Sequence, residues 1–174
     1  MKVGLLYTAL VLSLSLVSQT SLSQQRILFE KGMEDSAKIY LSMQKELAKD
    51  SFKSFAKLSI QLEKLAKRFD MSQIKGEHSK HYSGIPKKII SQSKILAKAR
   101  DIKEVRKSFK VLSQAFAMWV SMNKTKSLQI IYCPMAQASW IQKAGTEIAN
   151  PYLTNMPRCG NVIGESKGKK KHHH

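Results

Sequence analysis

The most regular pattern of apolar positions in this chain lies between residues 51 and 69. Phe55, Leu58, Leu62 and Leu65 recur there at spacings of three and four, with Lys, Gln and Ser between them. This spacing places the apolar side chains on one face of a helix, and that face needs a partner surface to cover it. The pattern therefore predicts an amphipathic helix over 51–69.

Weaker patterns of the same kind predict three further helices. One covers about 30–49, and another covers about 85–98, beginning near Pro86, whose missing N–H costs nothing in the first turn of a helix. The stretch before it has two glycines and little periodicity, so we expect a connection there. The last helix covers 101–123, with Asp101 placed to cap its first turn.

Four amphipathic helices joined by short connections pack most simply as an antiparallel bundle. After Lys126 the helical pattern of apolar residues ends. Three prolines exclude one long helix there, and a β-branched run at 128–132 predicts a short strand. The predicted fold class is therefore all-α, an antiparallel four-helix bundle with an irregular C-terminal cap that holds at most one short strand. We expect five side chains in the bundle interior: Phe55, Leu62, Phe109, Leu112 and Phe116.

Both ends of the chain are predicted to lie outside the folded domain. Residues 1–23 combine a positive start, an apolar run at 5–17 and a site of small residues, which is typical of a secretory signal peptide and too short to span a bilayer. Residues 24–165 are predicted to form one domain and 166–174 a disordered basic and histidine-rich tail. We therefore expect a periplasmic or secreted protein whose mature chain has no transmembrane segment.

Composition narrows the classes of partner and activity. The chain has 30 Lys and Arg residues against 12 Asp and Glu residues, a net charge of +18 at pH 7. Such a charge favours anionic surfaces, and nucleic acid is the weakest candidate for an exported protein. No motif of a nucleophilic enzyme or a metallohydrolase occurs, so we expect no enzymatic activity.

Four sulfur-bearing residues near the C-terminus are the strongest candidates for chemistry. Cys133 and Met135 lie in YCPM, and Met156 and Cys159 lie in NMPRCG. Thiolate and thioether sulfurs are soft ligands, which select Cu(I) or Ag(I) over hard cations. A disulfide is the alternative use of the two cysteines, because two lone cysteines in an oxidising compartment usually pair. Both uses require the two Cα atoms to lie within about 7 Å of each other.

Histidines provide one further candidate ligand. His78 and His81 form an HxxH step that could place two imidazoles on one face of a helix, so His81 is retained as an additional candidate metal ligand. The alternative is a solvated connecting loop, because Gly76 and Gly84 flank the pair closely.

Three stretches of the chain carry a resemblance to a known family: MSQIKGEHSKHYSGIPKKI, ARDIKEVRKSFKVLSQAF and YCPMAQASWIQKAGTEIANPYLTNMPRCG. Together they resemble a bacterial periplasmic domain family of unknown function, found alone or at the C-terminal end of copper and silver efflux adaptor proteins. The similarity covers about residues 39–165. It implies a helical domain that handles heavy metals, with an efflux adaptor or another periplasmic metal carrier as its partner. The implied ligands are Cys133, Met135, Met156 and Cys159.

The sequence thus predicts a periplasmic protein that binds Cu(I) or Ag(I) through a Cys/Met cluster, as a metallochaperone or an accessory to heavy-metal efflux. The alternative is a basic exported interaction protein that docks to acidic partners or to an envelope surface. In that alternative the two cysteines form a structural disulfide.

Overall fold

The computed structural model describes residues 27–69, 79–123 and 125–163, which form four helices and a three-stranded sheet. The predicted signal peptide at 1–23 and the predicted tail at 166–174 lie outside these residues. The helices are an N-terminal helix (residues 27–47), α2 (Phe55–Ala66), α3 (Ser79–Leu96) and α4 (Ile102–Asn123). The strands are β1 (Leu128–Cys133), β2 (Ala138–Lys143) and β3 (Asn161–Ile163).

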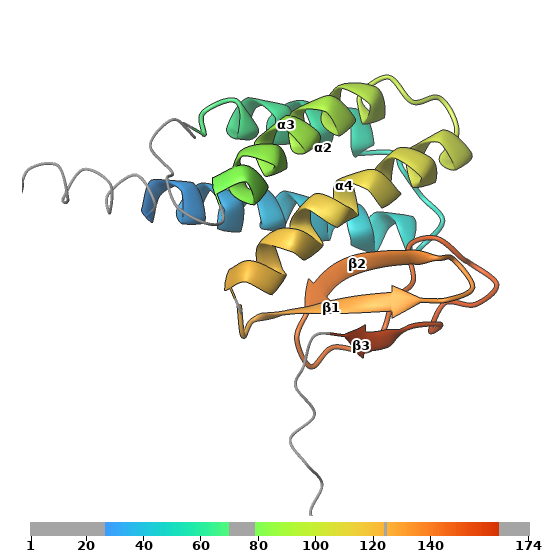
Figure 1. The fold of residues 1–174 in the computed structure, drawn as a ribbon. Coiled ribbons are helices and arrows are strands. Elements are labelled where there is room, and N and C mark those ends of the chain that lie inside the picture. Colours follow the sequence, from blue (N-terminus) through green and yellow to red (C-terminus); the bar gives the residue numbers. More distant parts are fainter. Residues whose placement is uncertain (1–26, 70–78, 124, 164–174) are drawn as a thin grey trace, which may run out of the picture.

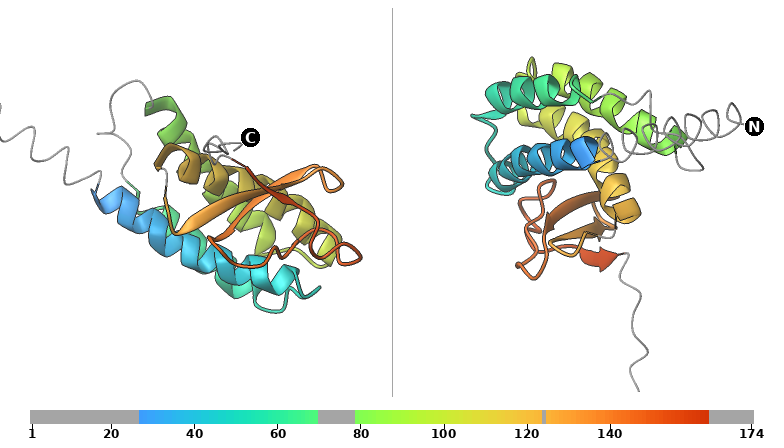
Figure 2. Two further views of the ribbon diagram at one scale, coloured as in Figure 1. Left: turned by 90° about the horizontal axis from the view of Figure 1, so that it is seen from below. Right: turned by 90° about the vertical axis from the view of Figure 1, so that its left-hand side faces the viewer.

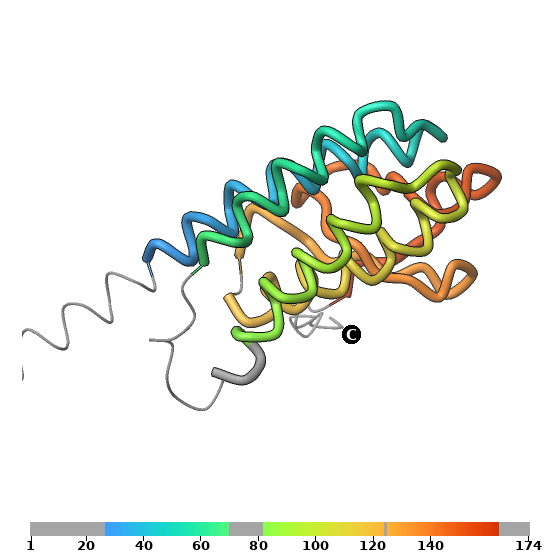
Figure 3. The backbone as a smooth tube through the Cα atoms, turned by 90° about the horizontal axis from the view of Figure 1, so that it is seen from above, coloured from blue at the N-terminus to red at the C-terminus, as the bar shows by residue number. Residues whose placement is uncertain are grey.

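The elements form three layers (Figure 1). Helices α2 and α3 make up one outer layer, the N-terminal helix and α4 lie in the middle, and the sheet forms the opposite outer layer (Figure 2). Each helix runs opposite to the one before it in the chain, as the tube view also shows (Figure 3). None of the helices in the described ranges combines the length and the hydrophobicity that crossing a membrane requires.

The predicted interior of the helical part is confirmed. Phe55, Leu62, Phe109, Leu112 and Phe116 are all buried, with at most 1% of their surface exposed. Tyr40 of the N-terminal helix completes this core, because its ring stacks on Phe109 with centroids 4.8 Å apart and lies 4.6 Å from Phe116. Apolar side chains at helical spacing thus meet across the two helical layers.

The predicted all-α class is wrong, because the C-terminal region is a sheet and the protein is mixed α/β. The strand predicted at 128–132 exists as β1, but it pairs antiparallel with β2 and β3 in the order β2-β1-β3. Sequence analysis missed β2 because Trp140, Ile141 and Gln142 are buried in succession, so the strand lacks the alternation of a half-buried strand.

Helix α3 also differs from its prediction. It begins at Ser79, six residues before the predicted start, and it contains Pro86 in its interior. The buried side chains Tyr82, Ile85 and Ile89 explain this, because their spacing of three and four extends the apolar stripe upstream of the proline. Packing of that stripe therefore outweighs the local preference of glycine and proline for a connection.

The start of α4 follows the prediction closely. A carboxylate oxygen of Asp101 accepts hydrogen bonds from the backbone N–H groups of Lys103 and Glu104, at 2.8 and 2.9 Å. The Glu104 carboxylate in turn accepts from the backbone N–H of Arg100 at 3.1 Å. These bonds satisfy N–H groups that have no partner within the helix.

Polar contacts join the helices to the loop that connects β2 and β3. The Tyr40 and Ser113 hydroxyls lie 2.6 Å apart, and Ser113 lies 2.8 Å from the Tyr152 hydroxyl. Gln44 donates from its side chain to the Ala149 carbonyl at 2.6 Å, and Arg106 donates to the Pro151 carbonyl at 3.0 Å. The loop is thereby fixed against the N-terminal helix and α4, and it leads directly to Cys159.

Candidate functional site

The register of the sheet brings the two cysteines together. Strand β1 pairs with β3 so that Tyr132 lies opposite Asn161. One further step in the same register places Cys133 opposite Gly160, which follows Cys159 directly. Residues that are 26 positions apart in the sequence thus meet at one end of the sheet. Both cysteines are free thiols, and their side chains share a hydrogen bond.

Hydrogen bonds to Cys133 change its acidity. Burial alone would raise the pKa of this thiol, but hydrogen bonds from the Cys159 thiol, from the Ala136 and Met135 amides and from the Asn150 side chain outweigh burial and lower the pKa. The bond from the Ala136 N–H to Cys133 Sγ measures 3.4 Å. The tight turn after β1 thus directs backbone dipoles at the sulfur.

The acidity of Cys159 changes in the opposite direction. Its hydrogen bond to Cys133 raises the pKa of the Cys159 thiol, and burial and the negative charge of the Cys133 thiolate act in the same direction. The pair therefore ionises first at Cys133, while Cys159 keeps its proton and donates it to the neighbouring sulfur.

Asn150 connects the two cysteine segments. Its side chain donates to the Cys159 carbonyl at 2.9 Å and also contributes to the lowered pKa of Cys133. Its Oδ1 accepts from the backbone N–H groups of Tyr152 and Leu153, at 2.8 and 3.1 Å. Asn150 is 1% exposed, so these bonds are made out of contact with water. Sequence analysis did not identify this residue, although it begins the NPY string that contributes to the family resemblance.

Gly160 allows the close approach of β3 to the rest of the sheet. Its φ of 151° is a conformation that residues with a side chain rarely adopt. A Cβ atom at this position would lie 2.6 Å from Ile131 and 2.9 Å from Trp140. Position 160 therefore requires glycine if Cys159 is to reach Cys133. Trp140 is itself fully buried.

The remaining predicted ligands are placed differently. Met135 lies in the turn after Cys133, where its backbone N–H lowers the pKa of both thiols, while its own side chain is 65% exposed. Met156 lies three residues before Cys159, accepts a hydrogen bond from the Cys159 N–H at 3.0 Å, and is also exposed. His81 lies in the first turn of α3, at the other side of the helical layers, and His78 lies outside the described residues.

This arrangement supplies two chemistries. Two sulfurs in contact can bind a soft cation once both are ionised, or they can be oxidised to a disulfide. Within the described ranges, no cluster of three or more His, Cys, Asp and Glu side chains is placed to hold a metal ion.

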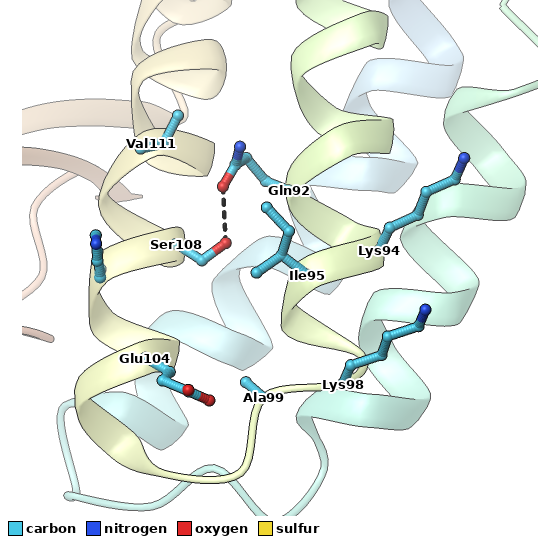
Figure 4. A pocket seen from close by; sticks show the side chains of 9 residues that line it. Gln92, Lys94, Ile95, Lys98, Ala99, Glu104, Ser108 and Val111 are labelled. Atoms are coloured by element: carbon cyan, nitrogen blue, oxygen red, sulfur yellow. Dashed lines mark hydrogen bonds between the residues drawn. The ribbon is translucent and has the colours of Figure 1, made fainter.

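A hollow of about 620 Å³ lies between α3 and α4, away from the cysteine pair (Figure 4). Ile95 and Val111 line it, and Gln92 accepts a hydrogen bond from Ser108 at 2.7 Å across it. Lys94 and Lys98 belong to its rim but extend away from it in the close view. No set of charged groups converges in this hollow, so it provides no comparable site.

The helical part of the chain is the part that matches a known family. The sequence model of a family described as "Protein of unknown function (DUF3347)" matches residues 37–127, just over half of the chain. The chain belongs to this family. It matches no curated protein and no solved structure.

The matched range of DUF3347 ends at residue 127, directly before β1 begins at Leu128. The predicted membership of a family of unknown function is thus confirmed through the helices. The four predicted sulfur ligands, Cys133, Met135, Met156 and Cys159, lie beyond the matched residues. The link to efflux adaptors and the sulfur motif stays a prediction.

Proposed function

We propose that this protein binds Cu(I), or its mimic Ag(I), between the sulfurs of Cys133 and Cys159. The observation that supports this most strongly is the contact between two free thiols, one of which has a lowered pKa. The thiolate is the form of cysteine that binds metals, so a lowered pKa increases the fraction of Cys133 that is ready to bind.

The chemistry of the donor set supports a soft monovalent cation. Among the described residues, no third His, Cys, Asp or Glu side chain joins the two thiols in a metal-binding group. Two sulfurs alone suit Cu(I) and Ag(I) better than Zn²⁺, which prefers four ligands in tetrahedral sites. Binding displaces the proton that Cys159 shares with Cys133. Cu(I) affinity should therefore rise with pH until both thiols are ionised.

Met135 and Met156 are proposed as additional ligands. Each belongs to the same short segment as one of the cysteines, and each is exposed, so its flexible side chain is free to turn toward the pair. A thioether cannot form a disulfide, so methionine keeps its sulfur available as a ligand in a compartment that oxidises thiols.

The wider role that fits such a site is that of an exported metallochaperone or an accessory to heavy-metal efflux. Support comes from the signal-like residues 1–23 and from the resemblance of the cysteine segments to domains attached to efflux adaptors. The proposed partner is such an adaptor or another periplasmic metal carrier.

The direct test is a titration of the reduced protein with Cu(I) in the presence of a competing coloured chelator. We expect one Cu(I) per chain, and we expect Cys133→Ser and Cys159→Ser to abolish binding at the same chelator concentration. A reduced parent protein that fails to remove any Cu(I) from the chelator would show that the proposed function is wrong.

The role of the methionines is tested by the double variant Met135→Leu/Met156→Leu. Leucine resembles methionine in bulk, so stability should change by less than about 1.5 kcal/mol. Cu(I) affinity should fall by at least about tenfold, or 1.4 kcal/mol. Met118→Leu is the matched control, because Met118 lies on α4 and is 38% exposed, close to the 39% of Met156. Equal affinity of double variant and control would remove the thioethers from the site.

A further inference from the structure

The positive charge of the protein is concentrated in one layer. Residues 51–69 and 79–100, which contain α2 and α3 and are here called the outer helical layer, hold eleven basic residues and one acidic residue, Glu63. Residues 27–50, which contain the N-terminal helix, hold four basic and five acidic residues. Residues 125–163, which contain the sheet, hold three basic residues and one acidic residue. The net charge of the chain is thus not spread evenly over its surface.

Most of this charge is free of partners. Among the described residues of the outer helical layer, Lys67 is the one basic side chain in an ion pair, with Glu63 at 2.6 Å. The inner face of each helix is apolar, so the lysines lie on the face turned away from the core. The exposed lysines recur at helical spacing: Lys57 and Lys64 on α2, and Lys87, Lys94 and Lys98 on α3.

A large aliphatic side chain interrupts this cationic face. Ile60, between Lys57 and Lys64 on α2, is 59% exposed. An isolated apolar side chain of this size gains free energy when a surface removes it from water. The layer therefore offers both charge and an apolar anchor.

We propose that the outer helical layer docks on an anionic lipid bilayer. The lysines would approach the headgroups, and Ile60 would enter the boundary between headgroups and acyl chains. Basic segments are attracted to such surfaces, and aliphatic side chains on the same face strengthen the attachment. This binding surface is separate from the cysteine pair and does not depend on the proposed Cu(I) site.

The kind of basic residue favours a bilayer over an acidic protein. Nine of the eleven basic residues are lysines. Lysine is a hydrated point charge without the fork that pairs arginine with a carboxylate, and protein interfaces are depleted in lysine and enriched in arginine and aromatic residues. A diffuse anionic surface matches this composition better than a set of positioned carboxylates.

The three-layer architecture determines how a docked molecule would be oriented on the bilayer. Because the outer helical layer and the sheet lie on opposite sides of the molecule, a docked chain turns its sheet toward the water (Figure 2). The end of the sheet that holds the cysteine pair, with the partly exposed Cys159, would stay open to soluble partners.

The test measures sedimentation of the full chain with vesicles. One set contains phosphatidylglycerol and phosphatidylcholine in equal parts, and the other contains phosphatidylcholine alone. We expect binding to the first set only, weakened by added salt. The outer-layer variant should partition at least about tenfold more weakly. It combines Lys57→Gln, Lys64→Gln, Lys87→Gln and Lys94→Gln.

The matched control removes the same charge from the N-terminal helix and the turn that follows it, through Lys31→Gln, Lys38→Gln, Lys45→Gln and Lys49→Gln, all of them exposed lysines. We expect its partitioning to stay within about threefold of the parent, because those lysines lie outside the docked face. An equal loss of vesicle binding in the two variants would show that net charge alone causes the binding, which would overturn the proposal. Circular dichroism of each variant confirms that it is folded.

Two other outcomes bear on the identity of the partner. Retention on immobilised polyglutamate without any binding to anionic vesicles would overturn the bilayer in favour of an acidic polypeptide. Vesicle binding that survives Ile60→Ser unchanged would overturn the insertion of this isoleucine. Cys133→Ser should bind vesicles as the parent does, so a failure of the Cu(I) site and a failure of this surface are distinguished.

Discussion

The outer helical layer and the sheet use their residues in opposite ways. In α2 and α3, one face is apolar and buried and the other is cationic and exposed. In β1 and β2, side chains of both faces are buried: Ile131 and Trp140 on one face, Ile130 and Ile141 on the other. The charge of the protein thus belongs to the region without reactive groups, and the reactive groups belong to the region with little charge.

This difference shows why net charge alone is a poor guide to the site. The donors that lower the pKa of Cys133 are a neighbouring thiol, backbone amides and the Asn150 side chain, not lysines. A site assembled from backbone dipoles keeps its properties at high salt, whereas attraction between exposed charges is screened. The two regions should therefore respond differently to mutation and to solution conditions.

The largest expected effect comes from removing Trp140, which is fully buried in the sheet and lies 6.0 Å from the Tyr152 ring. Trp140→Ala should destabilise the protein by about 3–5 kcal/mol. Because polar contacts tie the sheet to α4 and the N-terminal helix, helices and sheet should still unfold together. Urea denaturation, followed by circular dichroism and by the fluorescence of Trp119, measures the free energy of unfolding and the number of transitions. Two separate transitions would show that the sheet is an independent unit.

Leu62→Ala tests the buried face of the outer helical layer. Leu62 is completely buried, so the change should cost about 2–5 kcal/mol of unfolding free energy. The control is Ile60→Ala on the exposed face of the same helix, which should change stability by less than about 0.5 kcal/mol. Chemical denaturation of both variants gives the comparison, and similar losses would mean that the two faces have been assigned wrongly.

Asn150→Ala removes the amide that connects the two cysteine segments. Its loss leaves buried backbone groups without partners, and we expect a cost of about 1–3 kcal/mol. The pKa of Cys133 should also rise, because a hydrogen bond to the thiolate is lost. Asn155→Ala, at an exposed position five residues later, is the control. An unchanged thiol titration in Asn150→Ala would contradict the positioning role.

The smallest effect is a shift of acidity without a large change in stability. Cys159→Ala removes a hydrogen-bond donor to the Cys133 sulfur, so the pKa of Cys133 should rise toward its ordinary value. Thiolate absorbance near 240 nm, followed as a function of pH, measures it, and Cys159→Ser should shift the titration less because its hydroxyl can still donate. A titration that moves to lower pH would contradict the assignment of donor and acceptor.

The lowered pKa also sets the sign of a pH effect on stability. Because the pKa of Cys133 is lower in the folded than in the unfolded chain, its contribution is present above the unfolded value and is lost as pH falls through the folded value. Cys159 has a raised pKa, so its contribution is present below the unfolded value and is lost as pH rises through the folded value. The two contributions oppose each other across the alkaline range.

Sequence reasoning succeeded where one face of an element is buried. The spacing of Phe55 and Leu62 on α2, and of Phe109, Leu112 and Phe116 on α4, identified the helical core directly. It failed for β2, where burial on both faces removes the periodic signal, and for the start of α3, where tertiary packing outweighs the preferences of Gly84 and Pro86.

The candidate site was predictable in its residues but not in its geometry. The sequence suggested that Cys133 and Cys159 are neighbours, and their thiols are in contact. Which of them is the stronger acid depends on the turn after β1 and on the register between β1 and β3. Register is decided by packing and turn geometry far along the chain, so no local motif could give it. The role of Asn150 was not predicted either, because it too depends on how distant segments pack together.

The unequal burial of the two cysteines has a consequence for labelling experiments. Cys133, the more acidic thiol, is buried, whereas Cys159, the less acidic one, is partly open to solvent. Nucleophilicity and accessibility are therefore divided between two neighbouring atoms. A bulky electrophile should stop after one adduct at Cys159, while a small one can continue to Cys133. The steric size of a reagent, more than its intrinsic reactivity, will decide the stoichiometry of modification.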